Sequence, residues 1–259
     1  MVDSISSLFK PFDTYTVRAR IIPSLLAGLP SLALPFVLVP WNRLGLSNLI
    51  VTIMSFVLLY AFADLSRRSG YRVERRLGTR STPELWHRSN KELPNSTKDL
   101  YRPFVAAALK RAAPIEAEEL QQPEVANDFY RGVGDWLRDE TRDTKKFHLL
   151  FGELTTYGFR RNLRGLKPIA IVMNMVVAAV CGAILYYMPA YFVTVPNIQE
   201  KLYVVLLVVV VHTLYLLFAV DDKGVREASI AYGKQQILSC GALMKSPKSP
   251  RSKSQKGDL

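Results

Sequence analysis

The chain has 259 residues, of which 49% are hydrophobic, yet its formal net charge is +12. In a soluble domain the apolar residues recur at the period of a helix or strand, whereas here they form four blocks separated by charged sequence. This segregation indicates a membrane protein and argues against a single soluble domain. The two cysteines, Cys181 and Cys240, form no CxxC pair or Cys/His group, so neither a zinc site nor a disulfide framework is expected.

The four apolar blocks have the length of membrane-spanning helices. They occupy residues 21–40, about 46–63, 168–193 and 202–220. At about 1.5 Å per residue, each reaches across a hydrocarbon core of about 30 Å. Short connections join the first block to the second and the third to the fourth. The sequence therefore predicts an all-α membrane protein with two transmembrane hairpins, residues 21–63 and 168–220.

The distribution of Lys and Arg predicts the orientation. The hairpin tips carry only Arg43 and Lys201, whereas residues 65–167 carry 21 basic residues. Because basic loops close to the spans stay in the cytoplasm, we expect a multi-pass protein of the bacterial inner membrane with both termini inside. Its cytoplasmic parts are then the segment 1–20, a helical domain 64–167, and a C-terminal helix with a disordered basic tail, 221–259. A cleaved signal peptide is the rival interpretation of the first block, but that block is longer than a signal core and contains prolines.

Three residues within the spans are candidates for gating: Pro30, Pro35 and His212. Each proline removes a backbone hydrogen bond from the first span and favours a kink, which either bends on gating or is simply tolerated through neighbouring helices. An ionisable residue inside a membrane is a functional candidate by default. No Asp, Glu, Lys or Arg accompanies His212 in its block, so a neutral histidine bonded to another helix is the alternative to a proton relay.

Small residues in the third span form overlapping pairs four positions apart, at Ala178, Ala179, Gly182 and Ala183. Such pairs let a second helix approach closely, in the same chain or in another copy. This pattern predicts helix packing and suggests a homo-oligomer, which any pore would require.

Basic residues gather on both sides of the predicted domain, next to the membrane. This membrane-surface basic cluster consists of Arg67, Arg68, Arg72, Arg75, Arg76, Arg160, Arg161, Arg164 and Lys167. Anionic lipid headgroups attract each such residue by about 1 kcal/mol near the surface. We therefore expect anionic membrane lipids as partners, with a phosphate-bearing ligand as the alternative and nucleic acid disfavoured.

The predicted domain is helical and contains no recognisable catalytic motif. Short helices are expected from Pro83 through Trp86, from residue 96 or 97 through 110, over residues 124–143 and around residues 147–154. Between residues 116 and 143 nine acidic residues outnumber three arginines. No phosphate-binding loop, dinucleotide fingerprint or spaced metal ligands occur, so no enzyme activity, cofactor or metal is expected.

The segment YGFRRNLRGLKP, residues 157–168, resembles a little-characterised group of bacterial four-span proteins. The layout of two hairpins around a helical domain is also similar to that of membrane effectors of bacterial anti-phage systems. In those systems a sensor, such as a retron or a nucleotide-signalling enzyme, releases a small multispan protein that damages the inner membrane. The resemblance implies an effector role in antiviral defence and assigns no functional residues.

Two functions follow as hypotheses. The first is a non-enzymatic, pore-forming effector that perturbs membrane integrity or potential when its cytoplasmic domain receives a signal, for example from a sensor protein. The second is a scaffolding membrane protein that recruits a cytoplasmic partner through the acidic middle of its domain. A small transporter subunit would need a dedicated substrate site, which the sequence does not show.

Overall fold

The computed structural model describes residues 13–39, 48–79, 83–193 and 195–245, with side chains from residue 53 onward in the second range. These residues are mostly helical and include no β-strand. The chain divides into two compact units, described separately below. Unit 1 comprises Met1–Arg80 and Gly152–Ser229, and unit 2 comprises Ser81–Phe151 and Ile230–Leu259. Both ends of the predicted domain 64–167 thus belong to unit 1 with the apolar helices.

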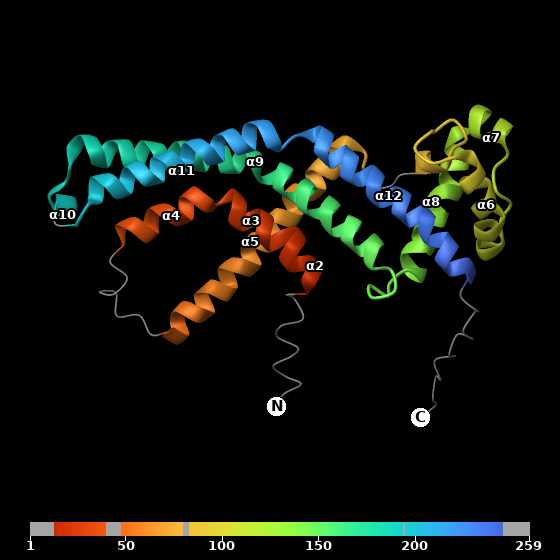
Figure 1. Cartoon of the computed structure of the whole chain (residues 1–259), viewed down its shortest axis with the longest axis horizontal. Coiled ribbons are helices and arrows are strands. Elements are labelled where there is room, and N and C mark those ends of the chain that lie inside the picture. The colour runs from red at the N-terminus through yellow and green to blue at the C-terminus, as the bar shows by residue number, and fades with distance from the viewer. Residues whose placement is uncertain (1–12, 40–47, 80–82, 194, 246–259) are drawn as a thin grey trace, which may run out of the picture. The chain divides into compact units, whose positions relative to one another are not determined.

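Two helices are long and apolar enough to cross a membrane. They are α9 (His148–Tyr187, 40 residues) and α11 (Ile198–Ala219, 22 residues), joined by a connection that contains the short α10 (Ala190–Val193). Residues 168–187 of the third apolar block and 202–219 of the fourth lie within them, and the two helices run side by side in Figure 1. Branched aliphatic side chains such as Val177, Ile184 and Val205 are buried together in a shared cluster. The prediction of membrane-spanning helices is confirmed for these two blocks, by length and composition.

The first apolar block forms a bent pair of helices instead of one continuous span, and the kink that its prolines predicted is present. Helical turns α2 (Thr14–Thr16), η2 (Val17–Ile21) and α3 (Ile22–Ala27) lead into α4 (Leu29–Leu38), and the chain bends by 57° between α3 and α4. Gly28 and Pro30 provide the reason, because glycine weakens a helix and proline lacks the N–H that would bond the carbonyl four residues earlier.

Residues 48–63 of the second apolar block lie in α5 (Asn48–Leu77). Residues 40–47 are outside the described part of the chain. The 30 residues of this helix span about 45 Å and carry the block onward into the arginine-rich stretch. Gly78 ends the helix at φ 67°, and the Thr79 N–H bonds the Glu74 carbonyl at 3.2 Å. Among described residues the structure therefore has two candidate spans, or three if the bent pair counts as one, and not the four that were predicted.

Glycines let α5 and α9 cross at close range. A Cβ on Gly165 of α9 would lie 2.5 Å from the backbone carbonyl carbon and oxygen of Ser69 in α5. Similarly, a Cβ on Gly70 would lie 1.8 Å from the side-chain oxygen of Asn162. A side chain at either position would separate the helices, so these glycines fix the distance between them.

Unit 2 is a small helical assembly with its own core. It contains η4 (Pro83–Trp86), α6 (Asn95–Leu109), α7 (Glu116–Gln121), α8 (Pro123–Glu140) and the C-terminal part of α12 (Asp222–Lys245). Buried core residues from these elements include Trp86, Val105, Phe129, Val133 and Cys240. The helices expected near residues 83–86, 96–110 and 124–143 are confirmed within a few residues.

Candidate functional site

A polar cluster lies between α9 and α11 inside their apolar contact. Asn174 and His212 are only 2% and 4% exposed. Asn174 Nδ2 donates to Thr213 Oγ1 at 2.8 Å, and the Asn174 amide lies 3.1–3.2 Å from His212 Nδ1. Because buried polar groups need partners, this cluster fixes the register of the two helices.

The break in the first span faces this cluster. Residue 30 is proline, so the carbonyl of Leu26 loses the N–H donor that a helix would supply. The Leu26 backbone lies within hydrogen-bonding reach of the His212 ring, and the buried ring nitrogen Nε2 has no other partner among the described residues. The break therefore leaves a backbone acceptor beside the second ring nitrogen of His212 in the interior. Pro35 lies within α4, which continues through it, so only Pro30 is associated with the break.

An apolar cavity of about 190 Å³ lies beside the break. The bent first span contributes Ser24, Gly28 and Ser31, and α5 and α9 contribute Phe62 and Leu166 among others. Ser24 Oγ lies 2.9 Å from the Phe62 carbonyl, whereas Ser31 Oγ is buried without a partner among the described residues. An unused polar atom therefore lies on the α4 side of the bend, next to the cavity.

Six residues of the predicted basic cluster are exposed, and the other three are buried or half-buried against polar groups of the protein. All five arginines of α5 are exposed, as is Arg160 of α9, in agreement with a surface position. Arg161 is instead buried at 6%. Lys167 Nζ donates to the carbonyls of Leu217 and Val220, where α11 ends. Arg164 Nε pairs with Asp222 at 2.9 Å.

Arg161 belongs to a buried polar network that joins α5 to α9. Its guanidinium is paired with the Glu74 carboxylate and lies over the rings of Tyr71 and Tyr157. Tyr157 Oη also bonds Thr79 and Glu74. Burial opposes the charge on Arg161, but the Glu74 carboxylate together with Tyr15 and Tyr157 outweighs this effect, so the pKa of Arg161 is raised. Burial raises the pKa of Tyr157 to about 12.

Sequence reasoning did not identify Glu74 or Tyr157 as partners of Arg161. One signal was present, since Glu74 is the single acid within the stretch RRSGYRVERR. An isolated acid among arginines is a candidate for a buried ion pair, but only the fold shows which arginine it meets.

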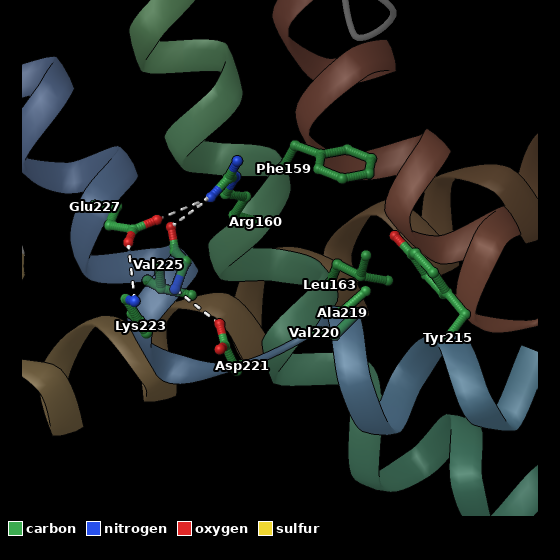
Figure 2. Close-up of a pocket in the computed structure, with 11 residues that line it drawn as sticks. Phe159, Arg160, Leu163, Tyr215, Ala219, Val220, Asp221, Lys223, Val225 and Glu227 are labelled. Atoms are coloured by element: carbon green, nitrogen blue, oxygen red, sulfur yellow. Dashed lines mark hydrogen bonds and ion pairs between the residues drawn. The ribbon is translucent and has the colours of Figure 1, made fainter.

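A second cavity, of about 470 Å³, lies where α11 turns into α12 against α9. Figure 2 shows charged side chains on one side, from Arg160, Asp221, Lys223 and Glu227, and apolar or aromatic side chains on the other, including Phe159, Leu163 and Tyr215. We call this the elbow cavity. The Asp221 carboxylate caps α12 by accepting the Gly224 N–H at 2.8 Å.

The predicted small-residue face is mostly uncovered within the chain. Ala178 packs against the α9–α11 cluster, but Ala179, Gly182 and Ala183 are exposed. A Cβ on Gly182 would meet nothing within 4 Å. This face is not used for close packing among the described residues, and the glycines of unit 1 that are so used include Gly70, Gly158 and Gly165.

Unit 2 has its own buried polar network, centred on Glu119. Its carboxylate accepts bonds from the Arg88 guanidinium at 2.7 Å and the Tyr130 hydroxyl at 2.6 Å. Burial and the bond to Glu119 raise the pKa of Tyr130 to about 12. A cavity of about 340 Å³ adjoins this network and is lined by Asp99, Glu116 and Leu120 among others.

No group of three metal-ligating side chains occurs among the described residues. No protein-family model, curated protein or solved structure matches the chain. The functional argument therefore depends on the chemistry of these sites.

Proposed function

We propose that this protein is a non-enzymatic membrane effector whose broken first span responds to a cytoplasmic signal and alters membrane integrity or potential. The observation that carries this proposal is that the break at Pro30 lies against the His212 ring of the buried polar cluster. Broken helices inside a membrane are tolerated where freed backbone groups are buried in protein or line a cavity. The Leu26 carbonyl and the nearby 190 Å³ cavity meet both conditions.

A polar group near the bend that lacks a hydrogen bond makes a rearrangement of the first span energetically favourable. Ser31 Oγ is buried without a hydrogen-bond partner among the described residues, which costs about 1–3 kcal/mol, and the Leu26 carbonyl meets the His212 ring in place of its helical N–H donor. A rearrangement that pairs Ser31 Oγ recovers part of that cost. A ligand or partner that favours one arrangement then shifts the population of the other.

The membrane topology is part of the proposal. We propose that α5 supplies a further span in the inner membrane, because its first half is apolar and its second half carries exposed arginines. The uncovered small-residue face of α9 supports a homo-oligomer, which a pore requires. An antiviral role with a sensor partner remains the biological setting that we propose.

The test is membrane potential during induced expression of the full chain, with and without the genes that flank it. We expect the membrane to depolarise when the chain is expressed either alone or together with its flanking genes. The variants Pro30→Ala and His212→Leu should reduce it, whereas Val211→Leu, one residue away and 58% exposed, should not. An unchanged potential and normal growth in every combination would refute the proposal.

A scaffold is the second candidate, and a specific surface of unit 2 favours it. Ile115 and Leu120 are 60% and 70% exposed beside the acidic residues of α7, and Leu120 lines the 340 Å³ cavity. Such a surface suits a basic, partly apolar segment of a partner. Purification in detergent should then yield a stable hetero-complex that Leu120→Ser disrupts, with no leakage from liposomes containing the complex. Leakage would favour the effector.

A further inference from the structure

The elbow cavity lies where the chain leaves its apolar environment. The apolar sequence of α11 ends at Val220, and Asp221, Asp222 and Lys223 follow directly. Under the proposed topology, on which this inference depends, that transition marks the inner surface of the bilayer. A cavity of about 470 Å³ at this level is open to lipid headgroups of the cytoplasmic leaflet.

The charged side of the cavity is balanced. Arg160 and Lys223 supply two positive charges, and Asp221 and Glu227 supply two negative charges. A purely anionic group that approached the cations would also meet both carboxylates. A ligand that carries both signs of charge, a few bonds apart, satisfies all four residues.

These charges are close together but only loosely paired. Glu227 lies 3.8 Å from Arg160 Nη1 and 3.9 Å from Lys223 Nζ, beyond the usual hydrogen-bond length of about 2.7–3.2 Å. Their side chains are 47% to 83% exposed. Arg160 is held in place by a 3.2 Å bond to the Gly224 carbonyl. The charged groups of Arg160, Lys223 and Glu227 are therefore held near one another and still have hydrogen-bonding capacity for a ligand.

The other side of the cavity suits a hydrocarbon chain. Phe159, Leu163 and Tyr215 line it, and they continue into the apolar helices α9 and α11 (Figure 2). Amphipathic aromatic side chains favour the boundary between headgroups and acyl chains. The cavity thus combines a charged part and an apolar part in the order in which a phospholipid presents them.

We infer that the elbow cavity binds an aminophospholipid, whose phosphate is held by Arg160 and Lys223 and whose primary ammonium is held by Asp221 and Glu227. The quaternary ammonium of phosphatidylcholine has no N–H group that could donate a hydrogen bond to these carboxylates. The glycerol headgroup of phosphatidylglycerol has no positive charge. The site therefore distinguishes phosphatidylethanolamine from phosphatidylcholine and phosphatidylglycerol. Because one charge-assisted hydrogen bond corresponds to roughly a tenfold change in affinity, we expect a preference of at least that size.

The test is native mass spectrometry of the full chain, purified in detergent, delipidated and titrated with each of the three lipids. We expect retention of phosphatidylethanolamine at concentrations roughly tenfold lower than for the other two. Glu227→Gln should remove the preference over phosphatidylcholine. Arg160→Gln and Lys223→Gln should weaken retention of phosphatidylethanolamine. The matched control is Arg226→Gln, which removes the same charge from α12 at a residue that does not line the cavity.

Equal retention of the three lipids, or tighter retention of phosphatidylglycerol, would overturn the inference. Soluble phosphoethanolamine at the same concentration serves as a separate arm. If it binds as tightly as the lipid, the site takes a free zwitterion and the lipid assignment is wrong. Lipid retention is measured without membrane potential or leakage, so its failure is distinct from failure of the proposed function.

Discussion

Arg161 of α9 and Glu74 of α5 form an ion pair in the interior of unit 1, with side chains that are 8% and 6% exposed. The two residues are 87 positions apart in the sequence, so the pair joins the arginine-rich end of α5 to the middle of α9. Its aromatic surroundings, Tyr71 and Tyr157, lie over the guanidinium. The pair explains why Arg161 is buried although its neighbour Arg160 is exposed.

Removal of one partner of this pair should destabilise the protein strongly. Arg161→Ala leaves the Glu74 carboxylate buried and uncompensated, which costs about 3–5 kcal/mol. We expect a clear fall in the thermal unfolding midpoint in detergent. The double variant Arg161→Leu with Glu74→Leu should recover much of the loss, because it buries no unpaired charge.

The control for that experiment is Arg68→Ala. Arg68 pairs with Asp64 within α5, and its side chain is 73% exposed, so its loss should cost less than about 1 kcal/mol. Similar midpoints for the Arg161 and Arg68 variants would show that the buried pair does not hold α5 on α9.

The close crossing of α5 and α9 predicts opposite effects for two glycines of one helix. Gly165→Ala places a Cβ 2.5 Å from the Ser69 backbone and should destabilise unit 1. Gly152→Ala meets nothing within 4 Å, and alanine favours a helix by up to about 1 kcal/mol, so it should be neutral or stabilising. The measurement is thermal unfolding of both variants in the same detergent. A stable Gly165→Ala variant would contradict the observed crossing distance.

The two prolines of α4 should differ in their effect on the bend. Pro30→Ala supplies an N–H that can donate to the Leu26 carbonyl, so the 57° bend should decrease. Spin labels at Leu25→Cys and Phe36→Cys, both exposed positions, should then move apart in pulsed electron resonance measurements. Pro35→Ala is the control, because α4 already continues through Pro35. An unchanged distance in the Pro30 variant would assign the break to Gly28 alone.

The buried phenol of Tyr157 should make unit 1 less stable at high pH. Its pKa is about 12 in the folded chain, against an ordinary value of 10.0. Below pH 10 both states are protonated and the contribution of Tyr157 is fully present. Between pH 10 and pH 12 only the unfolded chain ionises, so this contribution is lost as pH rises.

The pH effect is measured as the difference in unfolding midpoint between the native chain and Tyr157→Phe across this range. The native chain should lose stability more steeply than the variant. Tyr186→Phe, at a side chain that is 82% exposed, should follow the native chain. Parallel curves for all three would mean that Tyr157 ionises normally in the fold.

The sequence by itself determined the features that depend on composition along one segment. Apolar blocks of sufficient length predicted α9 and α11, and capping and apolar spacing predicted the positions of η4, α6 and α8. The prolines of the first block predicted a kink, and Pro30 lies beside the bend that the structure shows. These properties are local, because a helix forms and ends through residues within a few positions of one another.

Only the tertiary structure decided which residues meet. Arg161 and Arg160 are adjacent and chemically identical, yet one is buried against Glu74 and the other lines the elbow cavity. The small residues with the expected spacing, around Gly182, are exposed, whereas Gly165 makes the close crossing. The reason is geometric: successive helix positions differ by about 100° in direction, so the orientation of α9 against α5 selects the face that is buried.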